Sequence, residues 1–310
     1  MRTSLTKYLS VVASAALFSA GMLTSAFAGP ERIDSKDKMV MAPPPCDPRW
    51  YVSIGGSWDH SFSDFSNGAS ENIIVGDDDD IQLDVLSRDW DDAYSNWWNI
   101  QGEVGYVLTN HIELFGKFNY THGDAELVSG SIINFFGDPY TLVSKFGDYD
   151  SFGGDFGLRY FFMGKEARIR PYVSVSGGVA FVNSIGLHVE APALTTFGFP
   201  DATVYDGPFY DDSIVATVTG MLGVEFQVIP CKFSVGIEAG LSWQSDLEGN
   251  DSAFGTFFTG NAMTGTAAVG TNIGIISNQT ASELAAALSH LNDSGSRLSV
   301  PVDVYMKFRF

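Results

Sequence analysis

The sequence predicts an all-β fold: a transmembrane, antiparallel, up-and-down β-barrel of eight strands, with short turns at one end and long loops at the other. Three observations predict it. Eight segments alternate between apolar and polar residues, the connections between them alternate in length, and one face of each segment is apolar from end to end. A helix cannot produce a period of two, whereas a strand between two different solvents does.

Composition excludes several other classes of protein. The 310 residues include 17 Lys+Arg and 37 Asp+Glu, a formal charge of −20. This charge excludes a nucleic-acid partner, because phosphate contacts need a basic surface. The 45% hydrophobic and 14% aromatic content excludes a disordered acidic chain. Charged residues make up only 17%, against about 25% in soluble domains.

Residues 1–28 are predicted to be a cleaved signal peptide. Arg2 and Lys7 precede an apolar stretch over residues 9–23, and Ala26-Phe27-Ala28 forms a cleavage site. The alternative is a single membrane anchor, for which the apolar stretch is short against about 20 residues. After cleavage, 15 basic and 37 acidic residues remain, a charge of −22. Residues 29–49 read as a proline-rich periplasmic lead, and residues 50–310 as the barrel domain.

The first half of the predicted barrel has four strands, over residues 50–58, 98–108, 112–120 and 152–162. Apolar residues recur there at every second position, with mostly polar residues or glycine between them. In chain order the apolar positions are Trp50, Val52, Ile54 and Trp58; Trp98, Ile100, Val104, Tyr106 and Leu108; Ile112, Leu114, Phe118 and Tyr120; Phe152, Phe156, Leu158, Tyr160 and Phe162.

The second half has four more strands, over residues 169–181, 214–228, 233–243 and 298–310. The last is the clearest, because every even position from Leu298 to Phe310 is apolar and no odd position is aliphatic. Ten residue steps in a strand span roughly 33 Å, which at a tilt of about 40° gives roughly 25 Å of height. This height matches the apolar band of an outer-membrane barrel.

The connections determine the predicted orientation. Residues 109–111, 163–167 and 229–231 form short turns, whereas residues 60–96, 122–150, 183–212 and 246–296 form long loops. Short periplasmic turns and long extracellular loops are typical of bacterial outer-membrane barrels. A water-soluble sandwich also alternates, but its outer face is the charged one. Aromatic residues gather near both ends of the strands, as girdles at two membrane interfaces do.

The chain resembles the small eight-stranded outer-membrane β-barrel family, which includes OmpA-like, OmpX-like and opacity-type proteins. The leader, the eight segments, the turn Leu108-Thr109-Asn110-His111-Ile112 and the terminal strand carry this resemblance. It implies that Tyr305, Phe308 and Phe310 form an assembly signal for the barrel-assembly machinery. It also implies a monomer surrounded by outer-membrane lipid and lipopolysaccharide.

Two features depart from the family pattern. Pro301 lies within the last strand, where it removes a ladder donor, so a bulge is expected there. The loop over residues 246–296 is unusually long, and a hairpin over 267–276 would make the barrel ten-stranded. In the same loop, a short helix is expected over residues 281–291.

The inward-facing polar set predicts a network of charges in the lumen. Eight strands leave an interior that side chains just fill. A closed plug of paired charges is one interpretation, since unpaired buried charges are costly. A narrow pore that slightly favours cations is the other. The predicted network is Glu103, Lys117, Asp155, Arg159, Glu225, Glu238, Asp303 and Lys307.

The long loops carry most of the negative charge. Their densest cluster is Asp77, Asp78, Asp79 and Asp80. Carboxylate oxygens can hold Ca²⁺ or Mg²⁺, which would bridge the loops to lipopolysaccharide, although these four residues lack the spacing of an EF-hand. A solvated surface is the alternative. Cys46 and Cys231 both fall on the oxidising periplasmic side, so we expect them to form a disulfide.

The sequence favours a structural or surface-interaction role: envelope integrity, adhesion or host contact through the acidic loops. A narrow porin for small solutes or cations is the alternative. A barrel enzyme acting on lipid A or peptides is a third hypothesis. The nearest catalytic arrangements are His122 with Asp124 and His290 with Ser289, and neither matches a recognisable motif. The chain is therefore expected not to be an enzyme.

Overall fold

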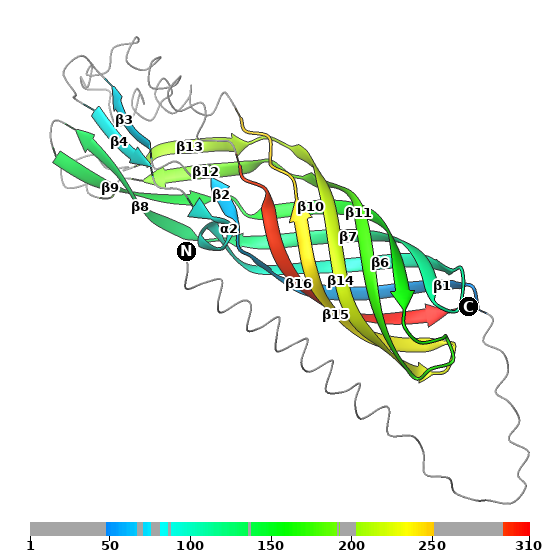
Figure 1. Ribbon diagram of the computed structural model, residues 1–310. Coiled ribbons are helices and arrows are strands. Elements are labelled where there is room, and N and C mark those ends of the chain that lie inside the picture. Colours follow the sequence, from blue (N-terminus) through cyan, green and yellow to red (C-terminus); the bar gives the residue numbers. More distant parts are fainter. Residues whose placement is uncertain are drawn as a thin grey trace, which may run out of the picture. The chain divides into compact units, whose positions relative to one another are not determined.

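A computed structural model of the chain describes residues 48–66, 71–75, 81–85, 88–135, 138–190, 192, 203–250 and 294–310. The predicted signal peptide and residues 29–47 of the lead lie outside these residues. Eight strands form a closed antiparallel barrel (Figure 1), in the order β1-β16-β15-β14-β11-β10-β7-β6. These strands are β1 (Trp50–Ser61), β6 (Tyr94–Val107), β7 (Ile112–Ala125), β10 (Tyr149–Phe161), β11 (Ile169–Val182), β14 (Ser213–Ile229), β15 (Phe233–Gln244) and β16 (Arg297–Arg309). The predicted eight-stranded barrel is confirmed.

One row of directly paired residues passes once around the barrel and rises along it. The row leaves β16 at Lys307 and returns to β16 at Arg297, a displacement of ten residues per circuit. Eight strands about 4.8 Å apart, with a rise of about 3.3 Å per residue, then tilt by roughly 40°. The row runs through Lys307, Ser53, Glu103, Lys117, Asp155, Gly178, Thr217, Gln244 and Arg297.

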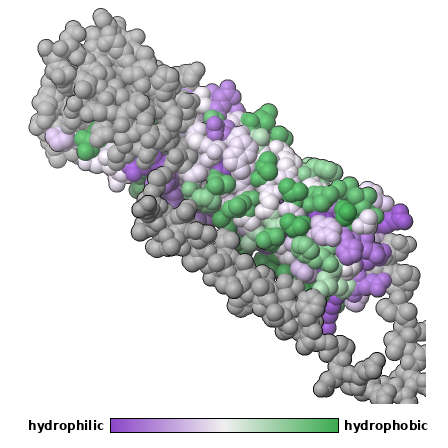
Figure 2. All heavy atoms as spheres, viewed as in Figure 1, coloured by the Kyte–Doolittle hydropathy of each residue, from purple (hydrophilic) through white to green (hydrophobic). Residues whose placement is uncertain are grey.

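The outer face of the barrel is an apolar band. Phe118, Ile214 and Leu222 are 72%, 77% and 64% exposed, although burying such a side chain is worth about 1.5–3 kcal/mol. Figure 2 shows hydrophobic side chains distributed over the visible face of the barrel. Exposed aromatic residues border the band at both ends, among them Trp50, Phe162 and Phe310 at the short-turn end and Trp58 and Phe152 at the other. None of the described helices is long and apolar enough to cross a membrane.

The bulge expected at Pro301 is absent. Pro301 pairs with Asp59 in an unbroken β1–β16 register. Pairing to β15 stops after Ala239–Val302 and resumes at Ser242–Ser299 without a shift. The missing proline N–H therefore interrupts one ladder locally and leaves the register unchanged.

A bulge occurs instead in β6, where the sequence pattern predicts none. The register with β7 shifts between Ser95 and Trp98, and Asn96 has a φ of 48°. Asparagine tolerates this left-handed conformation better than most residues. The extra residue lets Tyr94 and Trp97 both lie buried at the barrel mouth, while Trp98 packs against Tyr120 on the outer face.

The stretches predicted as long loops contain further strands, so that prediction was wrong in part. A six-stranded sheet has the order β13-β12-β9-β8-β4-β3, and β2 pairs with β5. These elements are β2 (Asp64–Ser66), β3 (Glu71–Val75), β4 (Ile81–Val85), β5 (Arg88–Asp89), α2 (Trp90–Ala93), β8 (Leu127–Phe135), β9 (Asp138–Phe146), β12 (Ile185–Glu190) and β13 (Thr203–Tyr210). β8 follows β7 after one residue, and β9 precedes β10 by two. The barrel hairpins therefore extend into this sheet (Figure 1).

The hairpin over 267–276 and the helix over 281–291 lie outside the described residues. The strands that are described close the barrel with eight members.

Candidate functional site: a lumen in three layers

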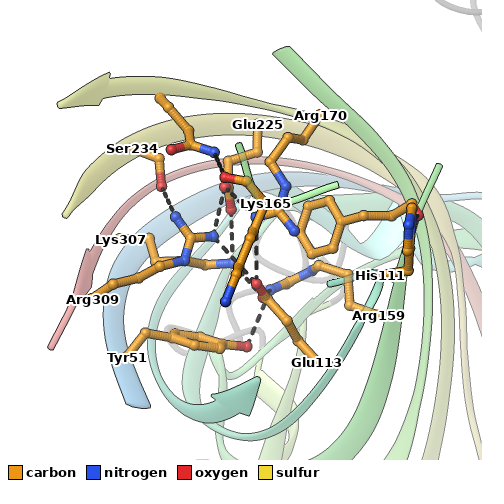
Figure 3. Close-up of polar contacts among 12 residues, drawn as sticks. Tyr51, His111, Glu113, Arg159, Lys165, Arg170, Glu225, Ser234, Lys307 and Arg309 are labelled. Atoms are coloured by element: carbon orange, nitrogen blue, oxygen red, sulfur yellow. Dashed lines mark hydrogen bonds and ion pairs between the residues drawn. The ribbon is translucent and has the colours of Figure 1, made fainter. Parts of the chain in front are cut away.

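The lumen is filled at the short-turn end by a network of ion pairs, which we call the plug. It consists of Glu103, Glu113, Glu225, Glu238, Arg159, Arg170, Lys307 and Arg309, each at most 9% exposed. The two-residue period of the strands places all of them on the inner face. Figure 3 shows Glu113 of β7 and Glu225 of β14 converging across the lumen with Lys307 and Arg309, which both lie on β16.

Two glutamates form the centre of the plug. Lys307 Nζ lies 3.0 Å from Glu113 Oε2 and 2.9 Å from Glu225 Oε2. Arg309 Nη2 lies 2.6 Å from Glu225 Oε1 and 3.3 Å from Glu113 Oε1. Arg170 Nη1 lies 3.1 Å from Glu225 Oε1 and is the third cation on that carboxylate. Each central carboxylate is therefore shared by several cations.

Arg159 connects this centre to the rest of the plug. It forms a two-pronged pair with Glu103, at 2.9 and 3.1 Å, and lies 3.9 Å from Glu238. The Tyr172 hydroxyl donates to Glu238 at 2.6 Å. The arginine also lies over the rings of Phe115 and Tyr172, each at 4.9 Å. Guanidinium groups combine forked pairing with ring stacking in this way.

The plug is balanced in charge, with four carboxylates and four cations among its eight members. Buried ions cost several kcal/mol each to desolvate, and the cost is recovered only when every partner is present. Each of the four carboxylates lies within 4 Å of at least one cation, so the plug fills the short-turn end of the lumen with paired charges.

A second layer, which we call the cap, covers the opposite end of the lumen. Its aromatic members Trp90, Tyr94, Trp97 and Tyr149 are at most 3% exposed, with neighbouring ring centroids 5.0–6.3 Å apart. Arg297 lies beneath them, 3.8 Å from the Trp97 ring centroid, and its Nη2 lies 2.6 Å from Asp59 Oδ2. Helix α2 carries Trp90, the bulged start of β6 carries Tyr94 and Trp97, and β10 begins with Tyr149.

Between plug and cap lies a polar cavity of about 80 Å³, which we call the chamber. Its charged lining residues are Asp59, Asp155, Asp303, Lys117 and Arg297, and most of its other lining groups are amides and hydroxyls. Asp155 accepts hydrogen bonds from Thr217 at 2.6 Å and from Asn119 at 3.1 Å. Gln101 donates to Asp303 at 3.0 Å.

The structure separates the eight predicted lumen residues into two groups. Glu103, Arg159, Glu225, Glu238 and Lys307 lie in the plug. Lys117, Asp155 and Asp303 line the chamber. Sequence reasoning missed Glu113, Arg170 and Arg309 of the plug and the Asp59–Arg297 pair. All five occupy polar positions of their alternating strands, so the same two-residue period could have identified them.

One histidine and two aspartates form a cluster on the outer face of the barrel. It lies one outward-facing position beyond Tyr120 and Phe152, and thus outside the apolar band. His122 Nδ1 lies 2.8 Å from Asp150, and its Nε2 lies 3.1 Å from Asp124. The hydrogen bond to Asp150 is the main reason why the pKa of His122 is raised. Both ring nitrogens are occupied by carboxylates, which suits an imidazolium rather than a general base or a metal ligand.

His188 repeats this arrangement on β12, with Glu190 two residues on at 3.0 Å and the cross-strand Asp206 at 3.7 Å. The described residues contain no group of three or more His, Cys, Asp or Glu that could hold a metal ion. Asp77, Asp78, Asp79 and Asp80 lie outside the described residues, as do His290 and Cys46. Cys231 lies in the short turn between β14 and β15, and its pairing with Cys46 stays a prediction.

No protein-family model matches the chain, and no curated protein matches it. Similar solved structures include Neisserial surface protein A, with 11% identity, 84% of this chain and 97% of that chain covered, and a TM-score of 0.34. The N-terminal β-barrel domain of Pseudomonas aeruginosa OprF has 12% identity, 83% and 97% coverage, and a TM-score of 0.32. Ail, the attachment invasion locus protein of Yersinia pestis, has 9% identity, 85% and 99% coverage, and a TM-score of 0.35. The closed order of its own eight strands, together with their exposed apolar outer face, gives the chain the fold of the small eight-stranded outer-membrane barrels.

Proposed function

We propose that the chain is a sealed outer-membrane barrel that presents an extracellular β-sheet for surface contact, in envelope integrity, adhesion or host attachment. One observation supports this most: the lumen is filled at both ends, while the hairpins of the barrel continue into a six-stranded sheet at one end only. In this proposal the short turns face the periplasm and the sheet faces the cell exterior, where it meets lipopolysaccharide and host-surface molecules.

Single-channel conductance of refolded residues 29–310 in a planar bilayer tests the sealed lumen. We expect a folded protein without conductance, because the balanced plug leaves no continuous aqueous path. Steady, reproducible openings would overturn the seal and establish the narrow porin in its place.

Cell adherence tests the surface role. Replacing residues 127–146 with a short turn removes β8 and β9 from the centre of the sheet and leaves β7 and β10 intact. We expect cells that display this variant to adhere less to cultured epithelial cells than cells with the full chain, at equal surface expression. Lys165→Ala, in a short turn, is the matched control and should adhere normally. Unchanged adherence of the hairpin variant would contradict the surface role.

The C-terminal strand is proposed to be the assembly signal read by the barrel-assembly machinery, and the barrel to be monomeric. Phe308 and Phe310 are exposed on the outer face, whereas Tyr305 is buried in the lumen. Replacing Phe310 with Ser should reduce the amount of folded protein in the outer membrane, while the purified variant still refolds in detergent.

A further inference from the structure

The chamber holds an unbalanced negative charge. Its lining contains three carboxylates, Asp59, Asp155 and Asp303, against two cations, Lys117 and Arg297. Asp59 and Arg297 form their own pair at 2.6 Å. Two carboxylates then remain against one lysine. The plug cannot supply the missing charge, because its four cations already face four carboxylates.

Asp303 is one of four chamber-lining residues with a buried, unsatisfied polar atom among the described residues; the others are Asp59, Asn99 and Gln244. It is 3% exposed, and its Oδ2 accepts a hydrogen bond from Gln101. Its Oδ1 is buried and accepts no hydrogen bond from the described residues. Lys117 forms no ion pair within the described part of the chain. Burying a carboxylate oxygen without a hydrogen-bond partner costs more free energy than burying an unpaired neutral polar group.

We propose that the chamber is a binding site for one monovalent cation of about the size of K⁺, held next to Asp303 Oδ1. The space suffices, because a water needs only about 10–15 Å³ of such volume and the chamber has about 80 Å³. An ion with a few of its waters therefore fits. Carboxylate, amide and hydroxyl oxygens surround it, among them those of Gln101, Asn119, Thr217 and Thr219.

The chemistry of the lining argues against the other ions. An anion would add to the excess negative charge. Ca²⁺ sites usually contain several carboxylates, whereas Mg²⁺ is bound through one or two, but either ion would give the two remaining carboxylates and one lysine of the lining a net positive charge. A single positive charge balances the remaining two carboxylates and one lysine.

Rubidium provides the test, because Rb⁺ substitutes for K⁺ and scatters anomalously. Crystals of the full mature chain grown in RbCl should show one anomalous peak in the chamber within ligand distance of Asp303 Oδ1. In solution, the thermal unfolding midpoint should be higher in RbCl than in N-methylglucamine chloride of equal ionic strength, because the organic cation is too large for the chamber.

Asp303→Asn should abolish both the peak and the difference in midpoint, and Glu190→Gln, an exposed carboxylate on β12, should keep both. The absence of a peak in the unmodified chain would overturn the proposal and show a chamber that holds only water or a protonated Asp303. A peak that persists in Asp303→Asn would also overturn it. If Asp303→Asn does not fold, the same two measurements are made on Asp155→Asn, which removes the other of the two remaining carboxylates of the chamber. This site does not depend on the surface role, so failure of either proposal leaves the other standing.

Discussion

At the scale of single residues, the lumen depends on complete sets of partners rather than on individual ion pairs. Glu113 and Glu225 are at most 1% exposed as side chains and share Lys307 and Arg309. A buried pair contributes little relative to an apolar replacement, but removal of one partner leaves an uncompensated charge. Replacing any one member of the plug would therefore leave its partners as buried charges without compensation.

Replacing Lys307 with Met tests this dependence. The change keeps most of the length of the side chain and leaves two glutamates short of a cation, so we expect a loss of about 3–5 kcal/mol in the free energy of unfolding. Urea unfolding of the refolded barrel measures it. Lys232→Met, an exposed position in the neighbouring short turn, is the control and should change stability by less than about 0.5 kcal/mol. Equal stability of Lys307→Met and the unmodified chain would contradict the account of the plug.

The His122–Asp150 pair predicts a pH dependence at the hairpin end of the barrel. Because the hydrogen bond that His122 donates to Asp150 raises the pKa of His122, the pair stabilises the fold fully below the ordinary histidine value of about 6.5. That stabilisation is lost as the pH rises through the higher folded-state value. An NMR titration of the His122 ring, assigned with His122→Gln, should therefore give a midpoint above about 6.5. Asp150→Asn should lower the midpoint, and an unchanged midpoint would refute the pairing.

At the scale of elements, the strands fit together through pairs of tyrosine and glycine across the lumen face. A Cβ added at Gly105, Gly223 or Gly236 would overlap the ring of Tyr51, Tyr172 or Tyr305, respectively. These three rings lie flat against the neighbouring strand where a side chain is missing. The glycines make room for the large side chains that fill an eight-stranded interior.

Gly223→Ala tests this packing. The new methyl group would displace Tyr172 from its hydrogen bond to Glu238, so we expect a loss of about 1–3 kcal/mol, as is typical of overpacking. Gly220→Ala is the matched control on the same strand, because its Cβ would meet nothing within 4 Å. Unfolding midpoints in the same detergent compare the two. Equal effects would show that the lumen rings shift freely.

At the scale of the whole molecule, the barrel has its polar groups inside and its apolar groups outside, the reverse of a soluble domain. Large hydrophobic side chains are exposed along all eight strands. Such a surface is stable only where the surrounding solvent is also apolar. In the proposed sealed barrel, the outer band and the six-stranded sheet are the surfaces left for interaction.

Leu222→Arg tests the membrane-spanning band. Leu222 lies near the middle of the apolar face of β14, and an arginine at the bilayer midplane costs about 2–4 kcal/mol. Ile214→Arg, at the end of the same face, should cost about 0–1 kcal/mol. Reversible unfolding from lipid vesicles measures both. In a water-exposed barrel both changes would be harmless, so two negligible effects would contradict the membrane assignment.

Much of the fold follows from local pattern. The two-residue period located all eight barrel strands to within a few residues, because the inner and outer faces of a barrel meet different solvents. The Asn96 bulge and the unbroken register at Pro301 were not anticipated, because pairing with the neighbouring strand decides whether an extra residue is accommodated. The sheet strands between residues 71 and 210 lie in stretches predicted to be loops. Their hairpins become one sheet only through the pairings β4–β8 and β9–β12, which join hairpins far apart in the sequence.

The candidate site, like the fold, could be predicted only in part from local sequence pattern. Alternation alone assigned Glu103, Arg159 and Asp303 to the lumen, since side-chain direction in a strand is a local property. Their height in the barrel was not readable, because it depends on the ten-residue displacement of the closed sheet. That displacement brings Lys307 to Glu113 and Glu225, three residues far apart in sequence, and leaves Asp303 beside a cavity. The chain pattern therefore determines which side chains face inward, and closure of the barrel decides which charges meet, because a charge is compensated only by partners that the strand register brings within a few ångströms.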